Sequence, residues 1–232
     1  MKIKCILWYD AFWGVIDLDS EEDPLKFPQP SGSVRVQKDM IAVAAIERDA
    51  ELMLRVREGD TESFEILLSK HRGPVIHFLY RMVQNQAVAE ELAQEVFLRV
   101  YKSRGNYEPT AKFTTWLFRI TSHLALNHIR DSKNERGQGS IDESSDDGLT
   151  LQVPDRGLNT EQTLVNKVRL DEVRRAIQGL PEKQRAAVLM HKYQEMEYAQ
   201  IASVLESTES AVKSLLFRAY ETLRVRLAHM AP

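Results

Sequence analysis

The chain has 232 residues, a formal net charge of -3 and a single cysteine. This length allows one large or two small domains, and the nearly balanced charge excludes a uniformly basic protein that coats nucleic acid. Because Cys5 is alone, an intrachain disulfide and a cysteine metal cluster are both excluded, and a reducing cytoplasm is the expected location.

The first segment, residues 1–48, mixes proline, glycine and acidic residues with isolated aromatics and has no sustained helical or strand period. It begins like a signal peptide, but Asp10 interrupts the apolar run and more acidic residues follow, which argues against secretion. The sequence contains no run of roughly 18 to 20 apolar residues of the kind that inserts into a membrane, so we expect a soluble protein. We interpret 1–48 as an irregular, disordered extension, and a true start at Met40 is the alternative.

Residues 49–131 show successive amphipathic helical patterns. Two apolar stripes lie on either side of Gly73-Pro74, which we expect to separate or bend the helices that carry them. A further helix is predicted over 86–103, then a loop over 104–112 and a helix over 114–131. Together they predict a compact all-α first domain.

Residues 132–160 break this pattern with glycines, a proline and acidic residues. Between Ser140 and Asp155 there are five acids and no base, which predicts a flexible acidic linker. Residues 161–232 form a second helical set, whose first helix is expected to stop at Gly179. The predicted fold class is all-α, with two small helical domains joined by the linker.

Residues 197–224 have the pattern of a helix-turn-helix. A short helix over 197–205 is followed by a turn over 206–208, where Ser207 or Thr208 supplies an N-cap hydroxyl. The face of the second helix that is suited to a major groove carries Ser210, Ala211, Lys213, Ser214 and Arg218. From Ser210 onward four basic residues oppose only Glu221, so phosphate contacts are available. An ordinary helix pair with a solvated charged face has the same pattern.

Several distant segments appear in the order and at the spacing typical of bacterial sigma factors of the extracytoplasmic-function type. They are Ala89–Phe97 (AEELAQEVF), Lys112–Ile120 (KFTTWLFRI), Leu180–Arg185 (LPEKQR), and Val212–Ser214 with Arg218–Ala219. The chain resembles this family over roughly residues 50–228. The resemblance implies sigma region 2 in residues 49–131 and sigma region 4 in residues 161–232.

The resemblance also implies roles for individual residues. The acidic, amide-rich helix over 86–103 resembles the one that binds the clamp helices of the polymerase beta-prime subunit, through Glu91, Gln94, Glu95 and Arg99. The segment that follows resembles the promoter-melting element, which holds unstacked bases of the minus-ten strand. Its expected DNA-binding residues are Asn106, Lys112, Thr115, Trp116, Arg119, His123, Asn127 and Arg130. The helix-turn-helix face would read the minus-thirty-five element.

Two of these assignments have structural alternatives. The helix face with Gln94 and Glu95 can also be a solvated face of paired charges, and Phe113 and Trp116 can belong to the core, since large aromatics at helical spacing are usually buried. The chain also departs from the family's usual pattern at three positions. His123 stands where asparagine is usual, Glu206 replaces a turn glycine, and Leu215 stands where arginine is frequent.

The expected partners are core RNA polymerase, through the beta-prime clamp helices and the beta subunit, promoter DNA, and an anti-sigma factor; no membrane insertion is expected. A helix-turn-helix repressor or response-regulator output domain is the competing function, but it leaves the segments before the linker unexplained. An enzyme is disfavoured, because the sequence has no phosphate-binding glycine loop and no His-Glu-x-x-His motif. No catalytic residue or cofactor is predicted, and no metal, because His123 and His128 lack the i,i+4 spacing of a helical ligand pair.

Overall fold

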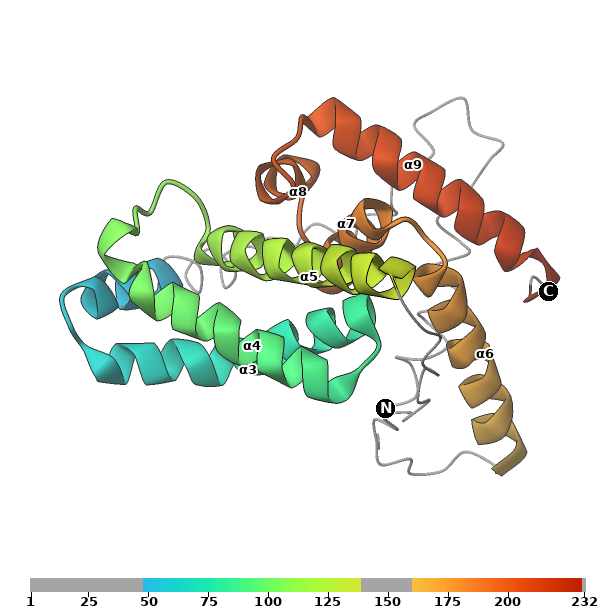
Figure 1. The fold of residues 1–232 in the computed structure, drawn as a ribbon, viewed down its shortest axis with the longest axis horizontal. Coiled ribbons are helices and arrows are strands. Elements are labelled where there is room, and N and C mark those ends of the chain that lie inside the picture. Colours follow the sequence, from blue (N-terminus) through green and yellow to red (C-terminus); the bar gives the residue numbers. More distant parts are fainter. Residues whose placement is uncertain (1–47, 139–159, 231–232) are drawn as a thin grey trace, which may run out of the picture.

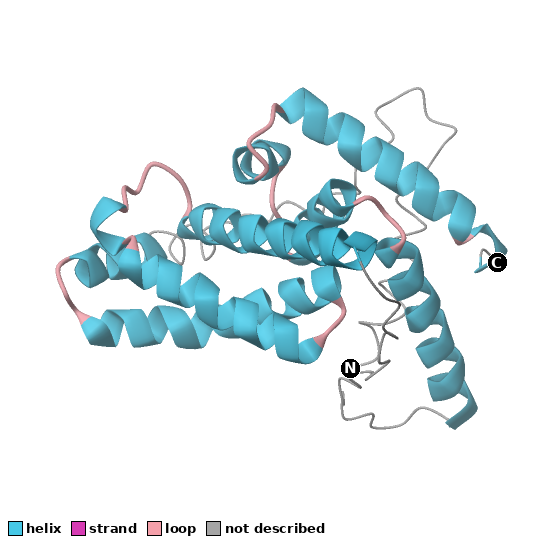
Figure 2. Cartoon of the chain, viewed as in Figure 1, coloured by secondary structure: helices cyan, strands magenta, loops and turns pink. Residues whose placement is uncertain are grey.

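The computed structural model describes residues 48–138 and 160–230. Over these ranges the chain consists of helices and connecting loops without strands (Figure 2), which confirms the all-α prediction. The predicted extension lies outside the described residues apart from Arg48, and so do residues 139–159 of the predicted acidic linker.

The first helical domain, for which we use the label region 2 that the resemblance implies, contains a layer of three helices with a short helix at its start (Figure 1). The second helical domain is labelled region 4 in the same way. Its elements are a helix over residues 48–57, α3 (Thr61–Val83), α4 (Gln86–Lys102), the short η1 (Arg104–Asn106) and α5 (Phe113–Gln138). Region 4 contains α6 (Thr160–Gln178), α7 (Glu182–Tyr193), α8 (Tyr198–Val204), α9 (Glu209–Arg226) and the short η2 (Ala228–Met230). Helices α3 and α4 lie on one side of α5, and α7, α8 and α9 lie on the other.

Two expected helix boundaries differ from the structure. Gly73-Pro74 does not separate two helices, because α3 continues through both residues. Proline removes one helical hydrogen bond, but Val75 and Phe78 in the next turn are fully buried, and this packing holds the helix together. Helix α5 runs on to Gln138 instead of ending at Asp131, since the sequence has no glycine or proline until Gly137.

The core of region 2 lies between α3, α4 and α5. The rings of Phe78 and Phe118 meet edge to face with centroids 5.4 Å apart, joining α3 to α5. Helix α4 adds the buried side chains of Val96 and Val100, which recur on one face of the helix. The apolar periodicity of the sequence thus accounts for this layer.

Region 4 is built around α7, which is buried without interruption from Ala186 to Met190. Such a run requires neighbours on more than one side, and α7 packs against α8 and α9 as well as against α3 and α5 of region 2. On α9 the predicted apolar face is confirmed, because the buried residues are Val212, Leu216, Ala219 and Leu223. The two domains are therefore packed together.

The N-cap of the second helix of the helix-turn-helix is Thr208, the last residue of the turn. Its hydroxyl oxygen accepts a hydrogen bond from the Ala211 N–H at 3.2 Å. Ser207, the other candidate, takes part through its backbone N–H, which donates to the Ala202 carbonyl at 2.9 Å. The cap satisfies one of the free N–H groups at the start of α9.

We expect Thr208→Ala to lower the free energy of unfolding by about 1 kcal/mol, because it leaves an N–H at the start of α9 without its partner. Urea unfolding followed by circular dichroism measures the change. Ser207→Ala is the matched control and should shift stability by less than about 0.5 kcal/mol. Equal effects of the two substitutions would contradict the assignment of the cap.

Candidate polymerase and nucleic-acid interfaces

An aromatic cluster supports the loop that leads into α5. The ring centroid of Tyr107 lies 5.0 Å from that of Trp116 and 6.2 Å from that of Phe113. Tyr107 and Phe113 are each only 1% exposed, whereas Trp116 is partly buried at the edge of the core. The core alternative is therefore confirmed for Phe113, and the cluster fixes the base of the loop.

A buried polar pair lies behind this cluster. The Asp49 carboxylate accepts hydrogen bonds from the Lys70 ammonium at 2.6 Å and pairs with His71 Nε2 at 3.0 Å. Burial opposes ionisation of Asp49, but the bonds from His71 and Lys70 outweigh it and lower the pKa of that carboxyl. The His71 ring in turn packs 5.2 Å from Phe113. This pair could not be predicted from the sequence, because Asp49 and His71 are 22 positions apart and belong to no common motif.

The predicted minus-ten residues fall into two groups in the structure. Asn106 is exposed and Lys112 half-buried on the loop, where both are available to DNA. On α5, four residues follow one another at steps of four, four and three and so share one face of the helix: Arg119, His123, Asn127 and Arg130. Thr115 is instead buried, and its hydroxyl oxygen accepts a hydrogen bond from Gln200 Nε2 of region 4 at 3.5 Å.

The four predicted polymerase-binding residues all lie on α4 and point to solvent or its edge. Glu91 and Gln94 are exposed, and the Glu95 carboxylate accepts a hydrogen bond from Arg99 Nε at 2.7 Å. Leu98 beside them is 45% exposed, so the surface offers apolar area within a ring of polar groups. A surface of this composition suits a helical protein partner.

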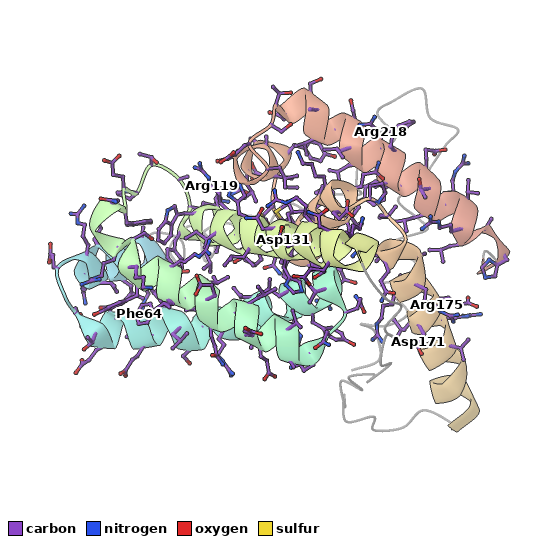
Figure 3. All side chains as sticks on the ribbon, in the orientation of Figure 1. Phe64, Arg119, Asp131, Asp171, Arg175 and Arg218 are labelled. Carbon is purple, nitrogen blue, oxygen red and sulfur yellow. The ribbon has the colours of Figure 1, made fainter. Side chains whose placement is uncertain are left out.

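The predicted minus-thirty-five residues lie within the first ten residues of α9, where Ser210, Lys213, Ser214 and Arg218 are exposed. Figure 3 shows Arg218 on this helix. Lys213 pairs with Glu209 at 3.2 Å one turn earlier. Over α9 the four basic residues therefore oppose two acidic ones, Glu209 and Glu221, which leaves a surplus of two positive charges. The Arg218 Nε donates to the Ser214 carbonyl at 3.2 Å, which leaves its terminal amines for other contacts.

A histidine and two tyrosines join the three helices of the helix-turn-helix unit. The His191 ring at the end of α7 stacks on Tyr198 of α8 with centroids 5.4 Å apart, and its Nδ1 lies 3.0 Å from the Tyr220 hydroxyl of α9. Burial disfavours the charged imidazolium and lowers the pKa of His191 to about 4, and the charge of Lys192 acts in the same direction. Burial also raises the pKa of the Tyr220 phenol. The aromatic residues of this cluster lie on either side of the turn in the sequence, but no sequence pattern predicted that they meet.

Comparison with known protein families decides the identity of the two domains. Residues 67–135 match the family description Sigma-70 region 2, and residues 170–223 match Sigma-70, region 4. Together these matches cover more than half of the 232 residues. The chain belongs to the sigma-70 family.

The relatives of this sigma factor place it in the extracytoplasmic-function group. It is 30% identical over 184 residues to the RNA polymerase sigma-H factor of Pseudomonas aeruginosa, covering 76% of this chain and 92% of the relative. The RNA polymerase sigma factor CarQ of Myxococcus xanthus is 32% identical over 178 residues, with coverages of 77% and 97%. The ECF RNA polymerase sigma factor SigW of Bacillus subtilis is 28% identical over 175 residues, with coverages of 75% and 93%.

Solved structures share the fold of this sigma factor. CnrH in complex with the cytosolic domain of CnrY aligns with a TM-score of 0.58 at 18% identity, over 79% of this chain and 99% of that one. The sigma factor RpoE of Bartonella quintana, in complex with the anti-sigma factor NepR, aligns with a TM-score of 0.55 at 18% identity, over 72% and 98%.

Two further properties concern the described parts of the chain only. No helix within 48–138 or 160–230 has the length and hydropathy needed to cross a membrane. Across the same ranges no three histidine, cysteine, aspartate or glutamate side chains are grouped closely enough to hold a metal ion.

The low pKa of His191 makes the stability of region 4 depend on pH. Well above pH 6.5 the imidazole is neutral in both the folded and the unfolded chain. As the pH falls from 6.5 to about 4, the unfolded chain binds a proton that the folded chain does not, so the free energy of unfolding falls by up to roughly 3 kcal/mol. Unfolding at a series of pH values should show a shallower slope for His191→Gln than for the wild type.

His229→Gln serves as the control for this measurement. The His229 side chain is 63% exposed and pairs with Glu172 at 3.3 Å on the surface. The slope of this variant between pH 6.5 and 4 reports the effect of removing an exposed imidazole, and the effect of His191→Gln is judged against it. A slope that His191→Gln does not alter would show that another group carries the pH dependence.

Proposed function

We propose that this sigma factor binds core RNA polymerase, directs it to specific promoters, and contacts the minus-ten and minus-thirty-five elements with separate domains. The observation that carries the proposal is the presence of three distinct polar surfaces on one chain. They are the acidic and amide face of α4, the loop and basic face of α5, and the polar start of α9. A DNA-binding repressor needs only the third.

Polymerase binding is assigned to Glu91, Gln94, Glu95 and Arg99 on α4. The exposed acidic groups favour a basic helical partner, which the clamp helices of the beta-prime subunit would supply. The exposed Leu98 contributes apolar contact area within the same surface. We assign a second contact with polymerase, through the beta subunit, to region 4.

Minus-ten recognition is assigned to the loop and to the exposed face of α5. Asn106 and Lys112 lie where a base leaving the duplex can be held, and Trp116 offers the half-buried edge of an aromatic platform. Arg119, His123, Asn127 and Arg130 extend the contact along the helix, while Thr115 becomes available only when region 4 moves away.

Minus-thirty-five recognition is assigned to the start of α9 in the major groove, with Ser210, Ala211, Lys213, Ser214 and Arg218 facing the DNA. The surplus of two positive charges on this helix is small, so affinity for DNA in the absence of polymerase should be weak and sensitive to salt.

The remaining parts of the proposal follow from the family. The chain itself performs no covalent chemistry, acts in the cytoplasm and is controlled by an anti-sigma factor. Of the two solved structures reported above, RpoE is bound to the anti-sigma factor NepR and CnrH is bound to the cytosolic domain of CnrY.

Run-off transcription with core polymerase tests the function. Core enzyme with the chain should produce discrete transcripts from a promoter library, and core enzyme alone should not. A repressor with the same helix-turn-helix would bind DNA but would neither stimulate transcription nor compete for the clamp helices. Absence of stimulation across the library would overturn the proposal.

The α4 surface makes a direct prediction about polymerase binding. A chain with Gln94→Ala and Glu95→Lys should bind core polymerase roughly tenfold or more weakly, because one substitution removes an amide contact and the other reverses a charge. Glu65→Lys on the exposed face of α3 is the matched charge control and should bind normally. Fluorescence anisotropy of the labelled chain measures both affinities, and equal losses would argue against the α4 surface.

The α9 surface predicts a sequence-dependent effect. Arg218→Ala should cost about 1 to 3 kcal/mol of binding to a minus-thirty-five duplex if the guanidinium reads a base, and it should then relax specificity at that base. If Arg218 contacts a phosphate, the loss is uniform and the slope of affinity against salt falls by about one. Lys183→Ala, which removes one exposed charge from α7, should leave binding unchanged. Unaltered binding by the Arg218 variant would remove this residue from the interface.

A further inference from the structure

The first helix of region 2, residues 48–57, lies beside the loop that joins α4 to α5 (Figure 1). It precedes residues 67–135, which match Sigma-70 region 2, and the surfaces assigned above to polymerase and DNA contain none of its residues. Its apolar side chains Leu52, Met53 and Val56 are buried in the core of region 2. A residue at or near each end of this helix holds one end of the loop, as the next two paragraphs describe.

Arg57, the last residue of the first helix, contacts the start of the loop directly. Its Nη1 donates a hydrogen bond to the Tyr107 carbonyl at 3.4 Å, a long bond that the charge of the guanidinium strengthens. The Tyr107 ring packs against Phe113 and Trp116, so the backbone and the side chain of Tyr107 are both held. Arg57 itself is exposed, and its bond therefore positions the loop without being part of the apolar core.

Asp49, near the other end of the first helix, acts on the end of the loop through His71 of α3. The Asp49 carboxylate lies 3.0 Å from His71 Nε2 and accepts a second bond from Lys70 at 2.6 Å. The His71 ring packs against Phe113 with centroids 5.2 Å apart, and Phe113 directly follows Lys112. Because a hydrogen bond is directional and apolar packing is not, Asp49 fixes the orientation of the ring on which Phe113 rests.

The pair of Asp49 and His71 is a costly way to fill a core. Taking a carboxylate out of water costs free energy that its attraction to a buried cation commonly fails to return, and apolar residues of similar volume often stabilise a fold as well or better. Asp49 and His71 are only 3% and 6% exposed, so both groups carry this cost. What the pair provides beyond filling the core is a fixed orientation of the His71 ring, which contacts Phe113.

The loop between the two held residues is short. Residues 108–111 are all exposed, and a backbone hydrogen bond of 2.8 Å closes a turn within them. Asn106 immediately precedes Tyr107, which Arg57 holds. Lys112 immediately precedes Phe113, against which His71 packs. The two groups assigned to minus-ten bases are therefore placed by contacts that start from the two ends of one helix.

We propose that Asp49 and Arg57 are positioning residues for promoter opening, and that they hold the loop so that Asn106 and Lys112 are in place before a base leaves the duplex. This inference rests on the minus-ten role assigned to the loop under the proposed function. A loop that is already ordered loses less conformational entropy when it captures a base. Loss of either contact should slow strand opening and leave polymerase binding through α4 and duplex binding through α9 unchanged, because those surfaces lie on other helices.

Arg57→Ala tests one end of the helix, and Arg55→Ala is its matched control. Both residues are exposed arginines of the first helix, but the charge of Arg55 acts on Asp60 and not on the loop. Opening is followed by 2-aminopurine fluorescence in the minus-ten element of a promoter recovered by run-off transcription. Arg57→Ala should slow opening about two- to tenfold and Arg55→Ala should not, while anisotropy shows equal affinity of both for core polymerase. Equal opening rates for the two variants would overturn the role of Arg57.

A double variant, Asp49→Ala with His71→Leu, tests the other end. It keeps the summed volume of the two side chains similar and removes the buried polar pair, so the fold should persist while the ring orientation is lost. Opening should slow roughly tenfold. A promoter with a mismatched minus-ten element, whose bases are already unpaired, should bring transcription close to the wild-type level. A defect that persists on this promoter would show general damage and overturn the positioning role. If the double variant is unstable, Arg57→Ala at its exposed position decides the case.

A fluorine label at Trp116 reports the order of the loop without transcription. The full chain is produced with 5-fluorotryptophan after Trp8 and Trp13 are replaced by phenylalanine, which leaves Trp116 as the one labelled residue. Its resonance should be a single narrow line in the wild type and the Arg55 control, and broad or split in the variants that release either end of the loop. A narrow line in all of them would overturn the inference even if the chain directs transcription. Altered lines without any transcription by the wild type would instead count against the sigma function.

Discussion

The packing of α5 on both of its sides constrains the rest of the structure. One side carries Leu117 into the core of region 2, and the other presents Thr115 to Gln200 of α8 and Arg119 to Glu206. A helix held in this way cannot adjust its exposed residues independently of either domain. The positions of Arg119 and His123 are therefore set by packing, and so is their meeting with Glu206.

The same constraint explains where the site is rigid and where it is open. The loop before α5 rests on Tyr107 and Phe113, which are backed by the pair of Asp49 and His71, so its base is fixed while Asn106 remains exposed. In region 4 a cluster of rings has the same supporting role. The rings of His191, Tyr198 and Tyr220 pack together and hold the second helix of the helix-turn-helix against the first. Each surface that we propose to bind DNA is thus supported by aromatic packing.

Much of this architecture could be predicted from the sequence because it depends on local patterns. The apolar spacing of Val212, Leu216, Ala219 and Leu223 defined the buried face of α9, and the segment 112–120 carried the family resemblance. Effects of tertiary packing could not be predicted. Pro74 lies inside a helix because the following turn is buried. Helix α5 continues past Asp131 for a local reason, since no glycine or proline occurs before Gly137, but its apolar pattern has already ended there. The pairing of Glu206 with Arg119 joins residues 87 positions apart and has no signature in one sequence.

We propose that one chain contacts two promoter elements through two domains, and cross-link mapping is the most direct test. A photoreactive amino acid is placed at Lys112 in one variant and at Arg218 in another, and each is assembled with core polymerase on the same promoter. We expect cross-links about 25 base pairs apart, or roughly 85 Å along the DNA, with Lys112 at the downstream element and Arg218 at the upstream one. Cross-links from both positions at one element, or from Arg218 alone, would contradict it.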